Sequence, residues 1–114
     1  YYLTYSGSHF ESPHYAVGYA TSESPLGPWT KHEHNPVMKS TSYAHGAAHH
    51  DFARSPDGRE FFIVYHRHYS LEATEPRAMA IDRVRFVRQD EGPEILEIHG
   101  PTATPQPRPS GSPP

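Results

Sequence analysis

Residues 55–66, SPDGREFFIVYH, decide the fold class of this chain. The first four residues, Ser-Pro-Asp-Gly, predict a tight turn, because Pro presets φ, Asp bonds its own backbone and Gly accepts a positive φ. Residues 60–66 follow directly and are apolar on both faces through their middle. This pattern is typical of a central strand that is covered on both sides, so we expect it to be the best-buried segment.

Shorter segments of the same character lie on both sides of this strand. No segment shows a 3.6-residue hydrophobic period, so the sequence predicts no helix. Strands of about six residues separated by Pro and Gly turns are typical of sandwiches, barrels and propellers, and periodicity alone leaves these three open. We expect strands at residues 1–6, 15–21, 49–54, 60–66, 77–88 and 94–99, a turn with at most a short strand at 24–29, and a loop at 32–46.

The segment at residues 15–21 indicates how the strands are layered. Its small residues Ala16, Gly18 and Ala20 alternate with larger ones. Side chains alternate between the two faces of a strand, so the face of small residues allows another sheet to approach closely. The sequence therefore predicts two stacked, antiparallel sheets.

Composition excludes several classes of protein. The chain has 114 residues, which is enough for one small domain or a piece of a larger one. No apolar run approaches the roughly 18 residues that a membrane-spanning helix needs, so we expect no membrane association. The net charge of −3 and the scattered basic residues do not favour nucleic acid as a partner. There is no cysteine, hence no disulfide or thiolate chemistry, and the sequence does not indicate a compartment.

The two ends of the chain have distinct characters. The sequence begins within an aromatic, β-branched segment without an initiator Met, and we interpret this as a fragment that starts inside a strand. Residues 101–114 contain six prolines, which predicts an extended, poorly packed tail after a domain at residues 1–100.

Histidines and two aspartates are the candidates for chemistry. The densest group of the ten histidines is His45, His49 and His50, followed by His66 and His68. A hairpin could bring some of them together as metal ligands, although polar histidines at strand ends are the more common reading. His49 and His50 are expected on opposite faces of one strand.

Asp51 lies beside these histidines, and Asp82 lies within an apolar stretch. For Asp82 we expect a structural ion pair with Arg83 or Arg77. The sequence contains no motif of a serine hydrolase, a zinc protease or a phosphate-binding loop.

Taken in order, a series of short motifs resembles glycoside hydrolase family 43. Each motif is weak alone, but the order and spacing match over nearly the whole chain, and residues 100–107 resemble the end of the family's catalytic domain. The motifs are YYLTYS at residues 1–6, YAVGYA at 15–20, SPLGPW at 24–29, GAAHH at 46–50, SPDG at 55–58, IVYH at 63–66 and IDR at 81–83.

The resemblance implies a five-bladed β-propeller, of which this chain would form about two blades. It also implies inverting hydrolysis of arabinose- or xylose-containing oligosaccharides or polysaccharides. Inversion needs a general acid and a general base roughly 6.5–9.5 Å apart with water between them. In the family both carboxylates and an Asp that tunes the acid precede the position matching Tyr1, so the resemblance places no catalytic residue in this chain and makes the remainder of the propeller its partner.

Two residues match functional positions of the family. His49 matches a histidine on the propeller axis beside a central cation, taken as calcium, which it contacts directly or through water. A hard cation prefers oxygen ligands, so the expected role of His49 is to orient the hydrated ion. Arg77 matches an arginine that contacts the sugar at the cleavage point, and a guanidinium fork suits two sugar hydroxyls.

Two other readings remain open. A non-catalytic carbohydrate-binding β-module could use the aromatic side chains for stacking on sugars, and a structural β-domain could carry histidines on its surface. The residues encoded before Tyr1 would separate these readings from the enzyme reading. If the family reading holds, the isolated chain is expected to be inactive and weakly stable, since its sheets would lack their neighbours.

Overall fold

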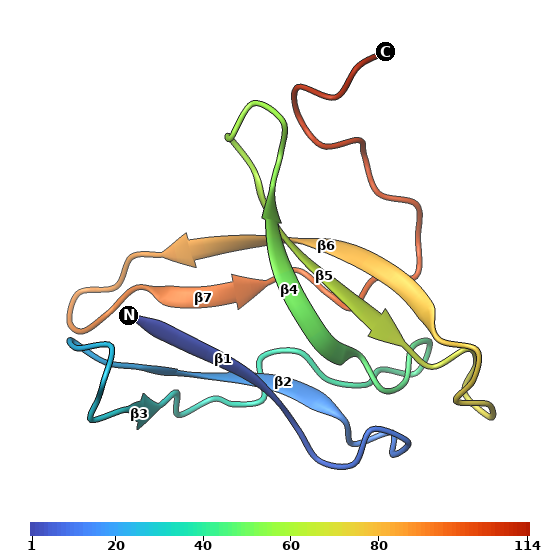
Figure 1. The fold of residues 1–114 in the computed structure, drawn as a ribbon, viewed down its shortest axis with the longest axis horizontal. Coiled ribbons are helices and arrows are strands. Elements are labelled where there is room, and N and C mark those ends of the chain that lie inside the picture. The colour runs from blue at the N-terminus through green and yellow to red at the C-terminus, as the bar shows by residue number, and fades with distance from the viewer.

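Seven strands and no helix make up the computed structural model, which describes all of residues 1–114. Within each of two sheets the strands lie side by side in chain order, and every pair is antiparallel. The predicted all-β fold is confirmed, and no element is a helix that could cross a membrane. The first sheet contains β1 (Tyr2–Gly7), β2 (Ala16–Thr21) and β3 (Thr30–Lys31); the second contains β4 (Ala48–Arg54), β5 (Phe61–Arg67), β6 (Ala78–Val87) and β7 (Ile95–Ile98) (Figure 1).

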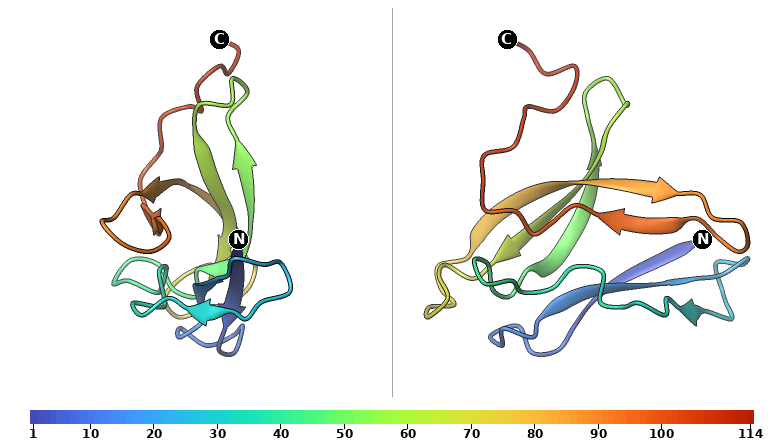
Figure 2. Two further views of the ribbon diagram at one scale, coloured as in Figure 1. Left: turned by 90° about the vertical axis from the view of Figure 1, so that its left-hand side faces the viewer. Right: turned by 180° about the vertical axis from the view of Figure 1, so that it is seen from behind.

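The core lies between the two sheets. Val17 and Tyr19 of β2 pack with Ile63 and Tyr65 of β5, and Phe61 packs against the same cluster. Alternate residues of β5 therefore fill the space between the sheets, as the period of two predicts. In the views of Figure 2 the first sheet lies on one side of β6 and β7, and the turn of the β4–β5 hairpin projects on the other side.

The prediction that β5 is the best-buried segment is wrong. β5 is buried at three positions, whereas β2 is buried at every position from Ala16 to Ala20. The loop that follows β3 explains the difference, because it returns along β2. Met38 forms a bridge with Val17 and is itself buried.

The small-residue face of β2 is approached closely, but not by another sheet. A Cβ atom on Gly18 would lie 3.1 Å from the side chain of Asn35 and 3.2 Å from the ring of Tyr5. Asn35 accepts a hydrogen bond from the Tyr19 N–H at 3.0 Å and donates to the Tyr19 carbonyl at 2.8 Å. The amide side chain therefore acts as a short substitute strand, and Gly18 leaves room for it.

Asp82 is buried, with 1% of its surface exposed, but the expected ion pair with Arg83 or Arg77 is wrong. Its carboxylate accepts hydrogen bonds from the Tyr65 hydroxyl at 2.6 Å and from the Thr102 hydroxyl and N–H at 2.6 and 3.0 Å. Burial and the hydrogen bond to Asp82 raise the pKa of Tyr65. A Cβ atom on Gly100 would overlap the carboxylate, so glycine allows the chain to pass here. Hydrogen bonds rather than a counter-ion thus satisfy this buried charge.

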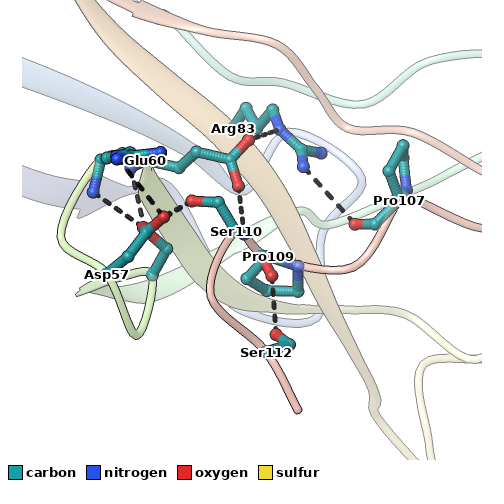
Figure 3. A network of polar contacts seen from close by, with 9 residues as sticks. Asp57, Glu60, Arg83, Pro107, Pro109, Ser110 and Ser112 are labelled. Carbon is teal, nitrogen blue, oxygen red and sulfur yellow. Dashed lines mark hydrogen bonds and ion pairs between the residues drawn. The ribbon is translucent and has the colours of Figure 1, made fainter. Parts of the chain in front are cut away.

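Residues 101–114 contain no helix or strand, but the expectation of poor packing is wrong at two points. Thr102 is bound to Asp82, and Pro101 is buried. Farther along, the Ser110 N–H donates to Glu60 at 2.7 Å and its hydroxyl donates to Asp57 at 2.6 Å (Figure 3). The tail is therefore fastened to the turn between β4 and β5.

Candidate functional site

A shallow pocket of about 560 Å³ lies over one end of the second sheet. His49 of β4, His66 of β5 and Arg77, which immediately precedes β6, all line it. The antiparallel register explains the meeting, because Ala48 pairs with His66, and Arg67 pairs with Ala78. Both residues that matched functional positions of the family therefore lie in one pocket.

His49 occupies an irregularity in β4. The pairing shifts by one residue between Ala48 and Asp51, and His49 has a φ of 55°, which is uncommon for a residue with a side chain. Its N–H donates to the Ser6 hydroxyl of β1 at 2.8 Å, so the bulge is tied to the other sheet. Because of this bulge, the regular alternation of side chains between the two faces of the strand, expected for His49 and His50, is interrupted.

Arg77 contacts His66 directly. The Nη1 of Arg77 lies 2.8 Å from the Nε2 of His66. Arginine carries no acceptor, so Nη1 donates and Nε2 accepts, which requires a neutral imidazole with its proton on Nδ1. Burial, followed by the charge of Arg77, lowers the pKa of His66, in agreement with a neutral ring.

The remaining surroundings of the guanidinium are aromatic and acidic. The centre of the Phe10 ring is 5.5 Å from the Cζ of Arg77, within reach of a cation–π contact. An oxygen of Glu75 lies 3.1 Å from the Arg77 Nε, yet Nε makes no hydrogen bond, so this contact is electrostatic with the N–H directed elsewhere. The Arg77 side chain is only 15% exposed.

The model of the family described as glycosyl hydrolases family 43 matches residues 1–93. The chain belongs to this family. Its helix-free, antiparallel sheets agree with the all-β fold that the sequence predicted. A crystal structure of a thermostable family-43 glycoside hydrolase is 39% identical in sequence and superposes with a TM-score of 0.85 over 97% of this chain and 35% of that one.

Two further family-43 comparisons have more specific names. The beta-D-galactofuranosidase xynD of Aspergillus niger is 31% identical over 100 residues, which are 87% of this chain and 28% of that protein. An endo-1,4-beta-xylanase from Bacteroides thetaiotaomicron is 33% identical with a TM-score of 0.76, over 88% of this chain and 33% of that one. The chain thus spans about a third or less of the length of these relatives.

The residues of this chain do not form a complete site for the central cation that the family resemblance implies. No three His, Asp or Glu side chains of the chain are grouped so that they could hold a metal ion. The nearest ring to His49 is that of His66, at 5.3 Å between centroids, and the Nε2 of His66 already faces the Arg77 guanidinium. His49 can offer at most one ligand, and calcium would need oxygen atoms from elsewhere.

Of the other histidines in the predicted cluster, His50 also lines this pocket, whereas His68 does not. The Nε2 of His68 lies 3.0 Å from the Phe10 carbonyl, and a Cβ atom on Gly46 would overlap the His68 ring. His50 is half-buried with no partner for its Nδ1, and burial lowers its pKa. His50 lies within β4 and His68 directly after β5, so the strand-end interpretation fits His68 but not His50.

Three residues of the site were not anticipated from the sequence. Phe10 and Tyr15 come from the loop after β1, and Glu75 comes from the turn before β6. The acidic residue two positions before Arg77 was a readable signal, since opposite charges at that spacing can pair in a turn. Nothing local marks Phe10, because its contact with Arg77 joins the two sheets.

Proposed function

We propose that this chain is part of a glycosidase that hydrolyses O-glycosidic bonds in arabinose- or xylose-containing glycans with inversion. Membership in family 43 supports glycoside hydrolysis. The related proteins are named for xylan and galactofuranoside substrates, which supports a carbohydrate substrate in general. The observation that carries the proposal for this chain is the position of Arg77 in the pocket.

Arg77 is suited to hold a sugar rather than to stabilise the fold. One amino group of its guanidinium donates to His66, and Nη2 has no hydrogen-bond partner in the chain. A planar fork with a free amino group matches two adjacent hydroxyl groups of a sugar ring. Only three of the eight residues that line the pocket are hydrophobic, so its wall offers many hydrogen-bonding groups to a sugar.

We further propose that the general acid and base come from outside these residues. Asp51 lines the pocket, but one of its oxygens accepts the Phe52 N–H at 2.8 Å. Asp82 is buried and fully engaged with Tyr65 and Thr102. Neither forms a pair of carboxylates facing across the pocket, which inversion requires. The remainder of a five-bladed propeller would supply them, together with oxygen ligands for a central cation beside His49.

The test uses the complete protein that contains residues 1–114, with 4-nitrophenyl α-L-arabinofuranoside, β-D-xyloside and β-D-galactofuranoside as substrates. We expect turnover of the first or second, and NMR of the first-formed sugar should show the inverted anomer. Faster turnover of the galactofuranoside would replace the proposed sugar. Binding of xylan or arabinan without turnover would support a carbohydrate-binding module instead.

A further inference from the structure

His66 holds a position that the proposed role of Arg77 does not explain by itself. An arginine side chain has four rotatable carbon–carbon and carbon–nitrogen bonds and loses about 2 kcal/mol of rotamer entropy when it is fixed. A guanidinium that must meet two hydroxyl groups is more effective when a partner has already fixed its plane. The Nη1–Nε2 contact of 2.8 Å makes His66 the one side chain that accepts a hydrogen bond from Arg77.

The neighbours of His66 restrict its ring from two sides. The His49 ring lies nearly perpendicular to it, at 79° and 5.3 Å between centroids. The Tyr15 ring lies 6.1 Å away on a tilted plane. The pairing of His66 with Met79 and with Ala48 fixes its backbone in the middle of a three-strand arrangement. The imidazole is therefore held by neighbours on more than one side.

Phe10 limits the guanidinium from another direction. Its ring centre lies 5.5 Å from the Arg77 Cζ, and its carbonyl lies 3.0 Å from the Nε2 of His68, which anchors the loop. The Glu75 carboxylate lies 3.1 Å from Nε without accepting a hydrogen bond, so it offsets part of the guanidinium charge but occupies none of its donors. The Nη2 amino group therefore remains available to electron-rich oxygen atoms of a ligand.

We infer that His66 is a positioning residue of the sugar site, which fixes the plane of the Arg77 guanidinium by accepting its Nη1–H through a neutral ring. The inference rests on the proposed function of Arg77 as a sugar-binding residue. It assigns His66 no contact with the sugar and no part in bond cleavage. Its effect is to reduce the entropy that Arg77 loses when the substrate binds.

The test compares His66→Phe with His66→Gln in the complete protein, on whichever nitrophenyl glycoside that protein hydrolyses. Phe keeps a ring of similar size without an acceptor, whereas the Gln carbonyl can replace Nε2. We expect His66→Phe to raise KM about 10-fold with little change in kcat, since a lost hydrogen bond to a charged group costs about 1.5 kcal/mol or more. His66→Gln should recover most of this loss. Arg77→Ala is the reference variant and should lower kcat/KM more than either.

The outcomes separate the two proposals. If Arg77→Ala lowers kcat/KM but His66→Phe leaves KM unchanged, the inference on His66 is overturned while the role of Arg77 stands. If Arg77→Ala has no effect, the role of Arg77 fails. If His66→Phe lowers both the melting temperature and the affinity, and His66→Gln then recovers the melting temperature of the unmutated protein but not its KM, His66 acts through stability alone and the inference is likewise overturned.

A measurement on the unmutated protein covers the case in which His66→Phe does not fold. Long-range ¹H–¹⁵N NMR spectra report which imidazole nitrogen carries the proton. We expect His66 at neutral pH with the proton on Nδ1 and a bare Nε2, as the bond from Arg77 requires. A proton on Nε2 would exclude the proposed hydrogen bond.

Discussion

Arg77 directly precedes β6 and Arg83 lies within it, but the two arginines have different environments. Arg83 is 29% exposed, and its Nε donates to the Glu60 carboxylate at 2.7 Å. Arg77 is more buried, at 15%, yet it makes its one hydrogen bond to a neutral imidazole and leaves Nε without an acceptor. The more buried arginine is thus the less satisfied one.

The difference agrees with a structural role for Arg83 and with the proposed sugar-binding role of Arg77. Leaving buried donors unmatched costs free energy, so a fold that served stability alone would pair Arg77 as it pairs Arg83. In the network around Arg83, Glu60 also accepts the Ser110 N–H, and Asp57 accepts the Ser110 hydroxyl (Figure 3). The Nε of Arg77, by contrast, is buried without an acceptor, which is uncommon in native structures.

The largest effect concerns catalysis by the chain as a whole. Because the pocket around Arg77 contains no facing pair of carboxylates, we expect the purified 114-residue chain to show no turnover of aryl arabinofuranosides or xylosides. A spectrophotometric assay measures this directly. Turnover that disappears in Asp51→Asn or Asp82→Asn would show that the chain holds its own catalytic group.

The next test compares the activity and the melting temperature of variants at the two arginines. In the complete protein, Arg77→Ala should lower kcat/KM by about 100-fold, because hydrogen bonds to a charged group contribute about 1.5–3 kcal/mol each. Arg83→Ala, the matched control, should leave kcat/KM within about 2-fold but lower the melting temperature, since it leaves Glu60 without its partner. Equal losses of activity in both variants would contradict the distinction.

The same comparison can be made for two carboxylates, the buried Asp82 and the exposed Asp51. Asp82→Ala removes the acceptor of the buried Tyr65 hydroxyl and of both Thr102 groups, so we expect a loss of about 3 kcal/mol in unfolding free energy. Urea denaturation followed by tryptophan fluorescence measures it. The exposed Asp51→Ala should stay within about 0.5 kcal/mol of the unmutated chain. Similar losses for both would place Asp51 among the structural carboxylates.

The smallest effect is the pH dependence of the tail contact. Hydrogen bonds from Ser110, Ser55 and the Arg59 N–H hold the pKa of Asp57 below its usual range, and the hydrogen bond from Arg83 does the same for the pKa of Glu60. A depressed pKa contributes stability above the ordinary carboxyl pKa, and the contribution is lost as pH falls through the folded-state value.

Ser110→Ala should therefore lower the melting temperature slightly at neutral pH, because one hydrogen bond to the exposed Asp57 carboxylate is lost. The difference from the unmutated chain should shrink as the pH is lowered from 7 to 3, which thermal melts monitored by circular dichroism would show. A difference that stays constant down to pH 3 would mean that Ser110 acts independently of the carboxylates.

Much of the fold followed from local patterns. The Ser-Pro-Asp-Gly turn, the apolar strand after it and the alternation along β2 each depend on neighbours within a few residues, so their positions are readable from the chain. The order of the motifs also placed His49 and Arg77 as site residues, and the structure brings both to one pocket.

Only the tertiary structure decided which groups satisfy the polar side chains. Asp82 is bound by Tyr65 and Thr102 rather than by an arginine, and Asn35 fills the space above Gly18. These partners are 16 or more residues apart in sequence, whereas Arg83 is the direct neighbour of Asp82. Strand register and the paths of the connecting segments bring the partners together, and a linear pattern carries no record of either. The contact of Arg77 with His66 belongs to this second group, since the family resemblance pointed to the arginine and only the structure shows its neighbour.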